Sequence, residues 1–304
     1  MAKAAFRTLL LALAVLAAAI GAARADESRP LRVVATFTIL ADMVRQVGDG
    51  RVAVTALVGP NGDAHVYEPT PADVRAVAEA DLLVVNGLGM EGWLDRLGRA
   101  AGYHGPVVVA SRGIAPREMS EDGRTAVDPH AWQDLADGRR YVQNIAEGLE
   151  KADPAHRTVY ADRAARYSAE LKDLDAWVRA EIGQVPPDKR EVITTHDAFG
   201  YFGAAYGVRF LAPEGISTDA EVTAGDFAHL IRQIRRTGVK ALFVENMSDP
   251  RLVRELADEA GVPVGGTLYV DALSPPDGPA PTYVDMFRSN VTQLVVAMER
   301  NRGE

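Results

Sequence analysis

The sequence contains no cysteine. That absence excludes disulfide bonds, zinc sites built from thiolates, and the lipid-carrying cysteine that holds an anchored lipoprotein at the membrane. Long apolar runs are also scarce, because residues 8–21 form one of signal-sequence length and no second run of that length follows. An exported chain of this composition is expected to be free in solution, without a membrane anchor.

The first 25 residues have the features of a secretory signal peptide. Lys3 and Arg7 supply a positive start, residues 8–21 an apolar core, and Ala23-Arg24-Ala25 an A-x-A cleavage site. A membrane anchor is the alternative, and it is disfavoured because the apolar run is shorter than the ~18 residues of a span. We predict cleavage of residues 1–25 and a location in the periplasm of a Gram-negative cell.

Basic residues are the minority charge. The whole chain has 33 Lys and Arg against 42 Asp and Glu, and the predicted leader holds three basic residues and no acidic one. The mature chain would therefore carry 30 basic and 42 acidic residues, a net charge of −12. Such an acidic balance argues against nucleic acid and anionic membranes as partners and is compatible with a cationic ligand.

Short apolar runs, each followed by a helical pattern, recur along the mature chain. In each half of the chain four of them have the length of buried strands: residues 31–36, 52–58, 82–86 and 106–110, then 191–195, 208–212, 241–246 and 263–270. Alternation of strands and helices over this length is typical of parallel sheets covered by helices. The predicted fold class is therefore α/β, with two lobes.

One long helix is predicted between the two halves, over residues 154–183. Its apolar residues recur at spacings of three, four and seven: Tyr160, Tyr167, Leu171, Leu174, Val178 and Ile182. Asp153 is a candidate N-cap with Pro154 as first helical residue, and Gly183 with the following prolines marks the end. This predicts an N-terminal lobe of residues 26–153, a rigid linking helix, and a C-terminal lobe of residues 184–304.

Four side chains occupy comparable positions at the ends of strands or the starts of helices. His65 follows the second predicted strand, His196 and Asp271 follow strands of the second half, and His130 precedes a helix. Ligands of open α/β sheets bind beyond the carboxyl ends of the strands, so two facing lobes could bring the four together in one cleft. Three imidazoles and one carboxylate would form a four-coordinate site for a borderline divalent metal.

The competing interpretation of these histidines is that each is an ordinary surface or core residue, since their spacing forms no compact motif. A second competing feature is Gly87-Leu88-Gly89-Met90-Glu91-Gly92, which matches the G-x-G-x-x-G pattern of dinucleotide sites. Glu91 would place a negative charge where the pyrophosphate lies, and export would remove the chain from nucleotides. We therefore interpret this segment as a tight turn between a strand and a helix.

Seven segments of the sequence, taken together, resemble bacterial solute-binding protein family 9. They are GDAHVYEPTPADV, ADLLVVNGLGMEGWLDRL, DPHAWQD, THDAFGYFGAAYG, GISTDAEVTAGD, ALFVENMSDPR and GTLYVDALS, in order along nearly the whole mature chain. The resemblance implies a periplasmic receptor that binds zinc or manganese for an ABC importer. It also implies two α/β lobes joined by one backbone helix, with the metal bound in the cleft between them.

Carried over by motif, the resemblance implies four metal ligands: His65, His130, His196 and Asp271. His104, His156 and His229 match no ligand position and are expected to be surface residues. Manganese members of the family usually carry Glu where His196 stands, so zinc (Zn²⁺) is favoured, with manganese (Mn²⁺) as the alternative. A histidine-rich loop common in zinc members is missing from residues 111–127, which weakens the preference for zinc without reversing it.

Three acidic residues are candidates to orient the ligand imidazoles: Asp128, Asp197 and Glu245. Trp132 and Tyr67 are expected to pack around the site. The expected partner is an inner-membrane ABC permease, and the chain is expected to act as a monomer. A zinc-dependent hydrolase is a less favoured alternative, because Asp271 would close the coordination position that a catalytic zinc keeps open.

Overall fold

Two parallel four-stranded sheets carry the fold in the computed structural model, which describes residues 29–121, 124–212, 218 and 224–301. The predicted signal peptide, residues 1–25, lies outside the described residues. The first sheet has the order β2-β1-β3-β4 and the second the order β10-β9-β7-β8. The strands are β1 (Leu31–Phe37), β2 (Val52–Val58), β3 (Leu82–Val85), β4 (Val107–Val109), β7 (Glu191–Ile193), β8 (Arg209–Leu211), β9 (Leu242–Glu245) and β10 (Val264–Leu268).

All eight predicted strands are present, with ends within two residues of those expected. Their pairing is parallel throughout both sheets. The four residues of β3 and the three of β7 are buried, as expected for strands that are covered on both faces. The α/β fold class is therefore confirmed.

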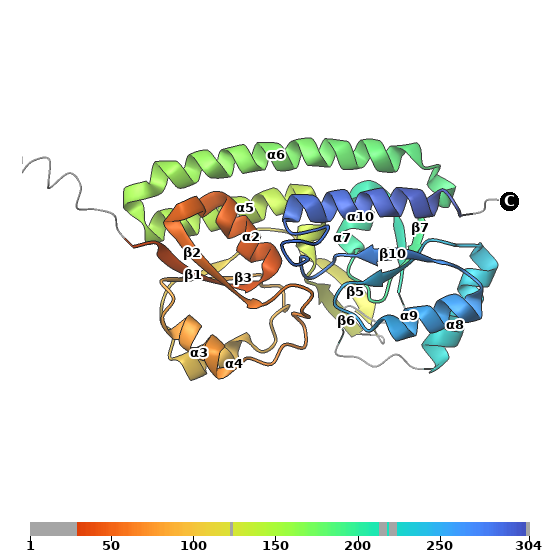
Figure 1. Cartoon of the computed structure of the whole chain (residues 1–304), viewed down its shortest axis with the longest axis horizontal. Coiled ribbons are helices and arrows are strands. Elements are labelled where there is room, and N and C mark those ends of the chain that lie inside the picture. The colour runs from red at the N-terminus through yellow and green to blue at the C-terminus, as the bar shows by residue number, and fades with distance from the viewer. Residues whose placement is uncertain (1–28, 122–123, 213–217, 219–223, 302–304) are drawn as a thin grey trace, which may run out of the picture. The chain divides into compact units, whose positions relative to one another are not determined.

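Helices cover these sheets, and most of them follow a strand (Figure 1). They are α2 (Thr38–Gly48), α3 (Pro71–Ala78), α4 (Leu94–Ala101), α5 (Leu135–Ala152), α6 (Arg157–Gln184), α7 (Gly200–Tyr206), α8 (Ala224–Thr237), α9 (Pro250–Ala260) and α10 (Tyr283–Met298). Short 3₁₀ turns lie at Asp49–Arg51, Ala131–Gln133, Pro154–His156 and Pro187–Lys189. Within the part of the chain that is described, no helix combines the length and the apolarity needed to cross a membrane.

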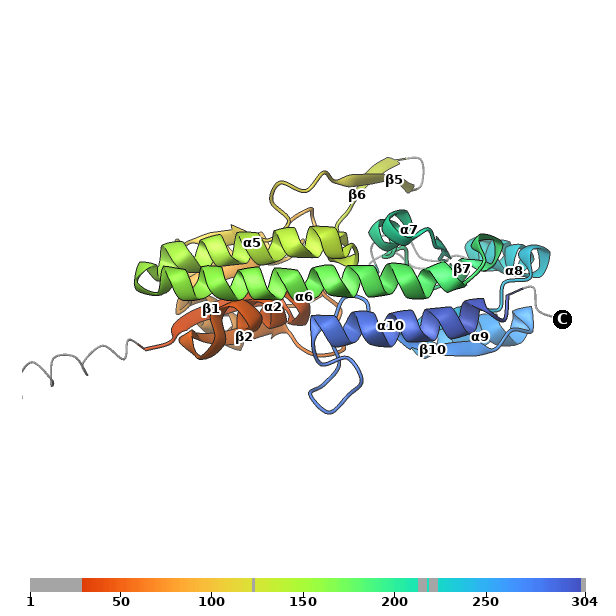
Figure 2. The same cartoon turned by 90° about the horizontal axis from the view of Figure 1, so that it is seen from above.

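The long helix α6 is where the sequence placed it, and its buried residues include all six of the predicted apolar stripe. It contacts α2 and α5 of the first half and α10 of the second. Figure 2 shows it running alongside elements of both halves. The helix therefore packs against both halves of the chain. The domain boundaries predicted at residues 153 and 184 stay predictions.

The start of this helix differs from the prediction. A 3₁₀ turn, Pro154–His156, comes first, and the α-helix begins at Arg157 with His156 as N-cap residue. The carboxylate of Asp153 makes no capping bond; it accepts hydrogen bonds from His156 Nδ1 and from the Tyr160 hydroxyl, both at 2.7 Å. Asp153 is engaged by side chains, so it is not available to the helix amides.

A two-stranded antiparallel hairpin was not predicted from the sequence. It consists of β5 (Arg117–Glu121) and β6 (Arg124–Asp128), and Arg117 lies opposite Asp128 in its register. Figure 2 shows it standing clear of α5 and α6. Its sequence is rich in charge and has few apolar residues, so apolar patterning could not identify it.

Buried hydrogen bonds join the two halves directly. The backbone N–H of Leu273 donates to Thr38 Oγ1 at 2.8 Å, and that of Tyr283 donates to Asp42 Oδ2 at 2.9 Å. Both acceptors belong to α2 of the first half, and both donors belong to the segment around β10 and α10 of the second. Residues from Leu31 onwards form one compact unit.

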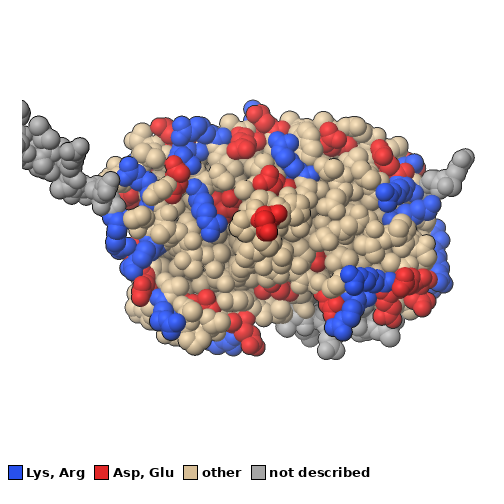
Figure 3. Space-filling view, in the orientation of Figure 1, with Lys and Arg blue, Asp and Glu red and all other residues tan. Residues whose placement is uncertain are grey.

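On the face shown in Figure 3, basic and acidic side chains are interspersed. No continuous basic surface is seen on that face, which agrees with the acidic balance of the sequence. A nucleic-acid-binding surface would instead gather lysines and arginines on one side.

Replacing Leu171 by Ala tests the support given by α6. Leu171 is fully buried, so the truncation is expected to lower the free energy of unfolding by about 2–5 kcal/mol, measured by urea denaturation. The neighbouring Glu170 is exposed, and Glu170→Ala should change the value by less than about 0.5 kcal/mol. Similar losses in both variants would show that α6 contributes no specific packing.

Candidate metal centre

The structure brings four of the singled-out side chains to one point. His65, His130, His196 and Asp271 each offer a ligand atom, and these atoms all lie within 4.8 Å of one another. His65 lies in the loop after β2, His130 directly precedes the 3₁₀ turn after β6, and His196 and Asp271 follow β7 and β10. Two of them come from each half of the chain, although up to 206 residues separate them in sequence.

The loop that carries His65 is fixed by hydrogen bonds on both sides. The backbone N–H of His65 donates to Asp63 Oδ1 at 2.8 Å, which makes a tight local turn. The indole N–H of Trp93 donates to the carbonyl of Ala64 at 2.8 Å, and the N–H of Asn61 donates to Leu273 O in the second half at 3.1 Å. The loop is therefore held in place before any ligand arrives.

The end of this loop is built by the start of α3. Thr70 and Asp73 form a reciprocal capping box, in which each side chain accepts from the other's backbone N–H. The hydroxyl of Tyr67 donates to Asp73 Oδ2 at 2.8 Å, and its ring lies 5.2 Å from that of Trp93. Tyr67 thus packs on Trp93 and points its hydroxyl at the helix cap, while its expected packing around the metal cluster stays a prediction.

His130 is held by the carboxylate of Asp128. Asp128 Oδ1 accepts from both the backbone N–H of His130, at 2.9 Å, and its ring Nδ1, at 2.8 Å. Both residues are fully buried. Because Nδ1 faces a carboxylate, it carries the proton, and the lone pair of His130 is therefore on Nε2. Trp132, also predicted to pack here, has its ring 5.3 Å from that of His130 and donates its N–H to Val270 O.

His196 has the same arrangement with Glu245, which ends β9. Glu245 Oε2 pairs with ring Nδ1 of His196, and Oε1 accepts from the backbone N–H groups of Thr195 and His196 at 2.9 and 3.1 Å. Asp128 and Glu245, two of the three predicted acceptors, therefore orient imidazoles, while the same role for Asp197 stays a prediction. With Nδ1 bonded to Glu245, Nε2 is the atom of His196 that would bind a metal, and it lies 3.4 Å from Asp271 Oδ2.

Asp271 completes the cluster with a carboxylate that is buried and unbonded. Its Oδ2 lies 3.4 Å from Nε2 of both His65 and His196, and its Oδ1 lies 3.6 Å from Nε2 of His130. Among the described residues, neither oxygen has a hydrogen-bond partner, and the same holds for Nε2 of His196. Buried polar atoms of native proteins are rarely left unpaired, so this group of orphaned atoms indicates a ligand.

The electrostatics of the cluster agree with its geometry. Burial would raise the pKa of Asp271, but His196 and His130 hold it well below its ordinary value, so the carboxylate is ionised. Burial lowers the pKa of His130 below its ordinary value. Burial also acts to lower the pKa of His196, but the charges of Glu245 and Asp271 raise it well above the ordinary value. The site therefore concentrates negative charge that attracts a cation.

The donor set fits a small divalent metal ion. Nitrogen and oxygen atoms placed tetrahedrally about 2.0–2.1 Å from a zinc ion would be roughly 3.4 Å apart. The separations of 3.2 Å between Nε2 of His65 and of His130, and 3.4–3.6 Å to Asp271, are close to that value. Two ring nitrogens at 3.2 Å need a proton or a cation between them, because both cannot present lone pairs to each other.

Only one member of the cluster has any exposed surface. The side chain of His65 is 5% exposed, and those of His130, His196 and Asp271 are fully buried. The remaining histidines lie outside the cluster. His104 and His229 are exposed, as predicted, and His156, which is half-buried, pairs with Arg51 at 2.7 Å and with Asp153.

The G-x-G-x-x-G segment is a turn that binds its own carboxylate. Backbone φ is positive at Gly87, Leu88 and Gly89, a conformation that favours glycine. Glu91 is buried, and its oxygens accept from the N–H groups of Asn86 and Gly87 at 2.6 and 3.2 Å and from the Thr36 hydroxyl at 2.7 Å. The place that a phosphate would take is therefore occupied by Glu91, as the sequence indicated.

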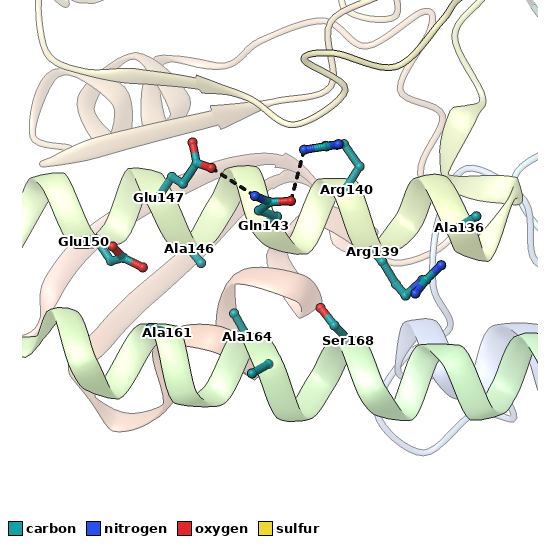
Figure 4. Close-up of a pocket in the computed structure, with 11 residues that line it drawn as sticks. Ala136, Arg139, Arg140, Gln143, Ala146, Glu147, Glu150, Ala161, Ala164 and Ser168 are labelled. Atoms are coloured by element: carbon teal, nitrogen blue, oxygen red, sulfur yellow. Dashed lines mark hydrogen bonds between the residues drawn. The ribbon is translucent and has the colours of Figure 1, made fainter.

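A groove of about 620 Å³ lies between α5 and α6 (Figure 4). Its floor is made of small residues, and its rim carries a chain of polar contacts in which Gln143 joins Arg140 to Glu147 at 3.0 and 3.4 Å. None of the four clustered residues lines it. Among the described residues, the one group that could hold a metal ion lies elsewhere.

Comparison with known proteins also finds similarity to metal-binding proteins. Residues 33–297 match a protein family described as zinc-uptake complex component A, periplasmic (ZnuA). The manganese-binding lipoprotein MntA of Halalkalibacterium halodurans is 30% identical over 303 residues, covering 99% of this chain and 100% of that protein.

Two solved structures have the same fold. The periplasmic zinc-binding protein TroA from Treponema pallidum is similar with a TM-score of 0.84 and 32% identity, covering 88% of this chain and 99% of that one. A manganese-bound periplasmic metal-binding protein from Candidatus Liberibacter asiaticus is similar with a TM-score of 0.78 and 30% identity, with the same coverage.

Glu91→Ala tests the interpretation of the glycine-rich turn. It would leave three buried donors without an acceptor, and the free energy of unfolding should fall by about 2–5 kcal/mol, measured by chemical denaturation. Asp95→Ala, an exposed acidic residue in the first turn of α4, is the control and should have little effect. A Glu91→Ala protein that was as stable as the unmodified chain and gained nucleotide binding would contradict the assignment of this segment as a turn.

Proposed function

This chain belongs to the ZnuA family of periplasmic zinc-uptake components, and we propose that it captures Zn²⁺ in the periplasm and delivers it to an ABC-type importer. Membership confirms the resemblance to solute-binding protein family 9. Members of the family are metal-binding substrate-binding proteins of ABC transporters. The single observation that carries the proposal is the meeting of three inward Nε2 atoms with the unbonded carboxylate of Asp271.

The four side chains would act as ligands of one ion. Asp128 and Glu245 hold the Nδ1 atoms of His130 and His196, so Nε2 of each ring is the atom left for the metal. Because the pKa of His196 is raised, metal binding would displace a proton from this ring. Asp271 would be the charged ligand, and His65 would be the ligand whose side chain is partly exposed to solvent. Because each half contributes two ligands, binding would fasten the halves together, and release would require them to separate or His65 to turn away.

Zinc is favoured over manganese by the chemistry of the donors. Three imidazole nitrogens suit a borderline ion, and the affinity of such a set rises from manganese to zinc. The spacing near 3.4 Å fits a compact tetrahedral site. Manganese is the second candidate, and its support is that MntA of H. halodurans is named for manganese while TroA of T. pallidum is named for zinc.

Transport rather than catalysis accounts best for the arrangement. A hydrolytic zinc keeps an open position for water, and here the fourth position is closed by Asp271. The carboxylates nearest the imidazoles, Asp128 and Glu245, are already engaged as hydrogen-bond acceptors. Their contacts fix the imidazoles, which accounts for both carboxylates without a catalytic role.

Substitution of the ligands tests the four-residue site. His65→Ala and His196→Ala should each weaken zinc binding by more than about 100-fold, because loss of an outer partner alone costs about 10–100-fold. Affinity is measured on chelator-stripped protein by competition with a chromophoric chelator. His104→Ala, an exposed histidine outside the cluster, is the control and should bind like the unmodified protein. Wild-type affinity in both ligand variants would rule the site out.

Parallel calorimetric titrations with zinc and manganese test the metal preference. We expect one tight zinc ion per chain and manganese binding that is weaker by at least about tenfold, from the order of affinities for nitrogen donors. Manganese binding as tight as zinc would mean that cavity geometry, and not donor type, selects the ion. The chain would then be a manganese receptor of the same transporter class.

A further inference from the structure

Tyr201 lies where the unpredicted hairpin meets the second half of the chain. It is the second residue of α7 (Gly200–Tyr206), and its side chain is only 5% exposed. The hairpin β5–β6 belongs to the first half, and α7 follows His196 after three intervening residues. Tyr201 therefore connects an element that carries Asp128 to an element that follows a ligand of the other half.

The hydroxyl of Tyr201 joins both strands of the hairpin at its open end. It accepts from the backbone N–H of Arg117 at 2.9 Å and donates to the backbone carbonyl of Asp128 at 3.3 Å. Arg117 and Asp128 are opposite each other in the register, so one hydroxyl contacts the last pair of the ladder. The guanidinium of Arg117 also lies over the Tyr201 ring, 5.6 Å from its centroid.

The same contact bears on the metal centre through Asp128. The residue whose carbonyl Tyr201 contacts is the residue whose carboxylate holds His130, by two hydrogen bonds. The helix start is also pressed against that carboxylate, because a Cβ at Gly200 would lie 2.4 Å from Asp128 Oδ2. A two-stranded hairpin has little stability by itself, so the position of Asp128 depends on such anchoring.

We propose that Tyr201 is a positioning residue of the metal centre, which fixes the Asp128–His130 pair of the first half against the second half beside His196. The proposal rests on the proposed function, since it assigns a role within the same site. Tyr201 acts through Asp128 and does not touch the metal. Its hydroxyl sets the direction in which Nε2 of His130 points, and it thereby sets the geometry that the metal meets.

Tyr201→Phe removes the hydroxyl and keeps the ring. Zinc affinity, measured by chelator competition, is expected to fall by about tenfold, the lower end of the range for outer partners of metal ligands. The visible absorption of the Co²⁺-loaded protein reports coordination geometry, and its bands should shift. A purely structural tyrosine would leave that spectrum unchanged.

Tyr206→Phe is the matched control, because Tyr206 is a buried tyrosine of the same helix. Its hydroxyl donates to Asp175 at 2.9 Å and accepts from the N–H of Leu135 at 3.4 Å, away from the four ligands. The control should lower the urea midpoint of the metal-free protein and keep the zinc affinity and Co²⁺ spectrum of the unmodified chain. An equal loss of affinity in both variants would overturn the proposal.

A double-mutant cycle with Asp128→Asn tests the route of action. If Tyr201 acts through the carboxylate of Asp128, adding Tyr201→Phe to Asp128→Asn should lower zinc affinity by less than about twofold more. A further tenfold loss in the double variant, or a Tyr201→Phe protein that binds like the unmodified one, would overturn it. Failure of the unmodified chain to bind zinc would instead reject the proposed function, so the two failures are distinguishable.

Discussion

A buried carboxylate that has no hydrogen-bond partner among the described residues is the constraint around which the site is arranged. Asp271 is fully buried and ionised, and its oxygens face three imidazole nitrogens. Burial of a charged carboxylate without hydrogen bonds is costly, and a divalent cation coordinated by the same atoms would offset that cost. The neighbouring carboxylates of Asp128 and Glu245 add to the negative field, and each is bound to an imidazole that can face the cation.

The rest of the fold keeps these groups at fixed separations. The helix α6 packs on elements of both halves, and buried hydrogen bonds tie the segment around β10 and α10 to α2. The loop of His65 is bonded to both halves, through Trp93 on one side and Leu273 on the other. A preformed site of this kind binds its ion with little reorganisation, which favours affinity and demands a separate means of release.

Much of this could be predicted from the sequence, for identifiable reasons. Parallel strands buried on both faces appear as short apolar runs, and the stripe of α6 repeats with helical spacing, so the sheets and the long helix were recognisable. The four candidate ligand positions followed from the rule that sites lie beyond strand ends, and the family resemblance named the same four residues. Their meeting within 4.8 Å is a long-range fact that only the structure supplies.

The features that were missed or wrongly predicted from the sequence also have physical causes. The sequence of the hairpin β5–β6 is rich in charge and poor in apolar residues, so no apolar pattern indicated it, although it carries Asp128. The prediction of Asp153 as N-cap of α6 was wrong, because its carboxylate accepts hydrogen bonds from the side chains of His156 and Tyr160. Local helix propensity does not reveal these contacts. The contact of Tyr201 with the hairpin depends on the packing of two segments that lie more than 70 residues apart in sequence.

The most direct test of the central claim is a crystal structure of the zinc-loaded protein, with anomalous diffraction measured on both sides of the zinc absorption edge. We expect one strong anomalous peak, bonded to Nε2 of His65, His130 and His196 and to the carboxylate of Asp271, at about 2.0–2.2 Å. A peak held by other residues, or no peak at this point in protein shown to contain one zinc per chain, would contradict it.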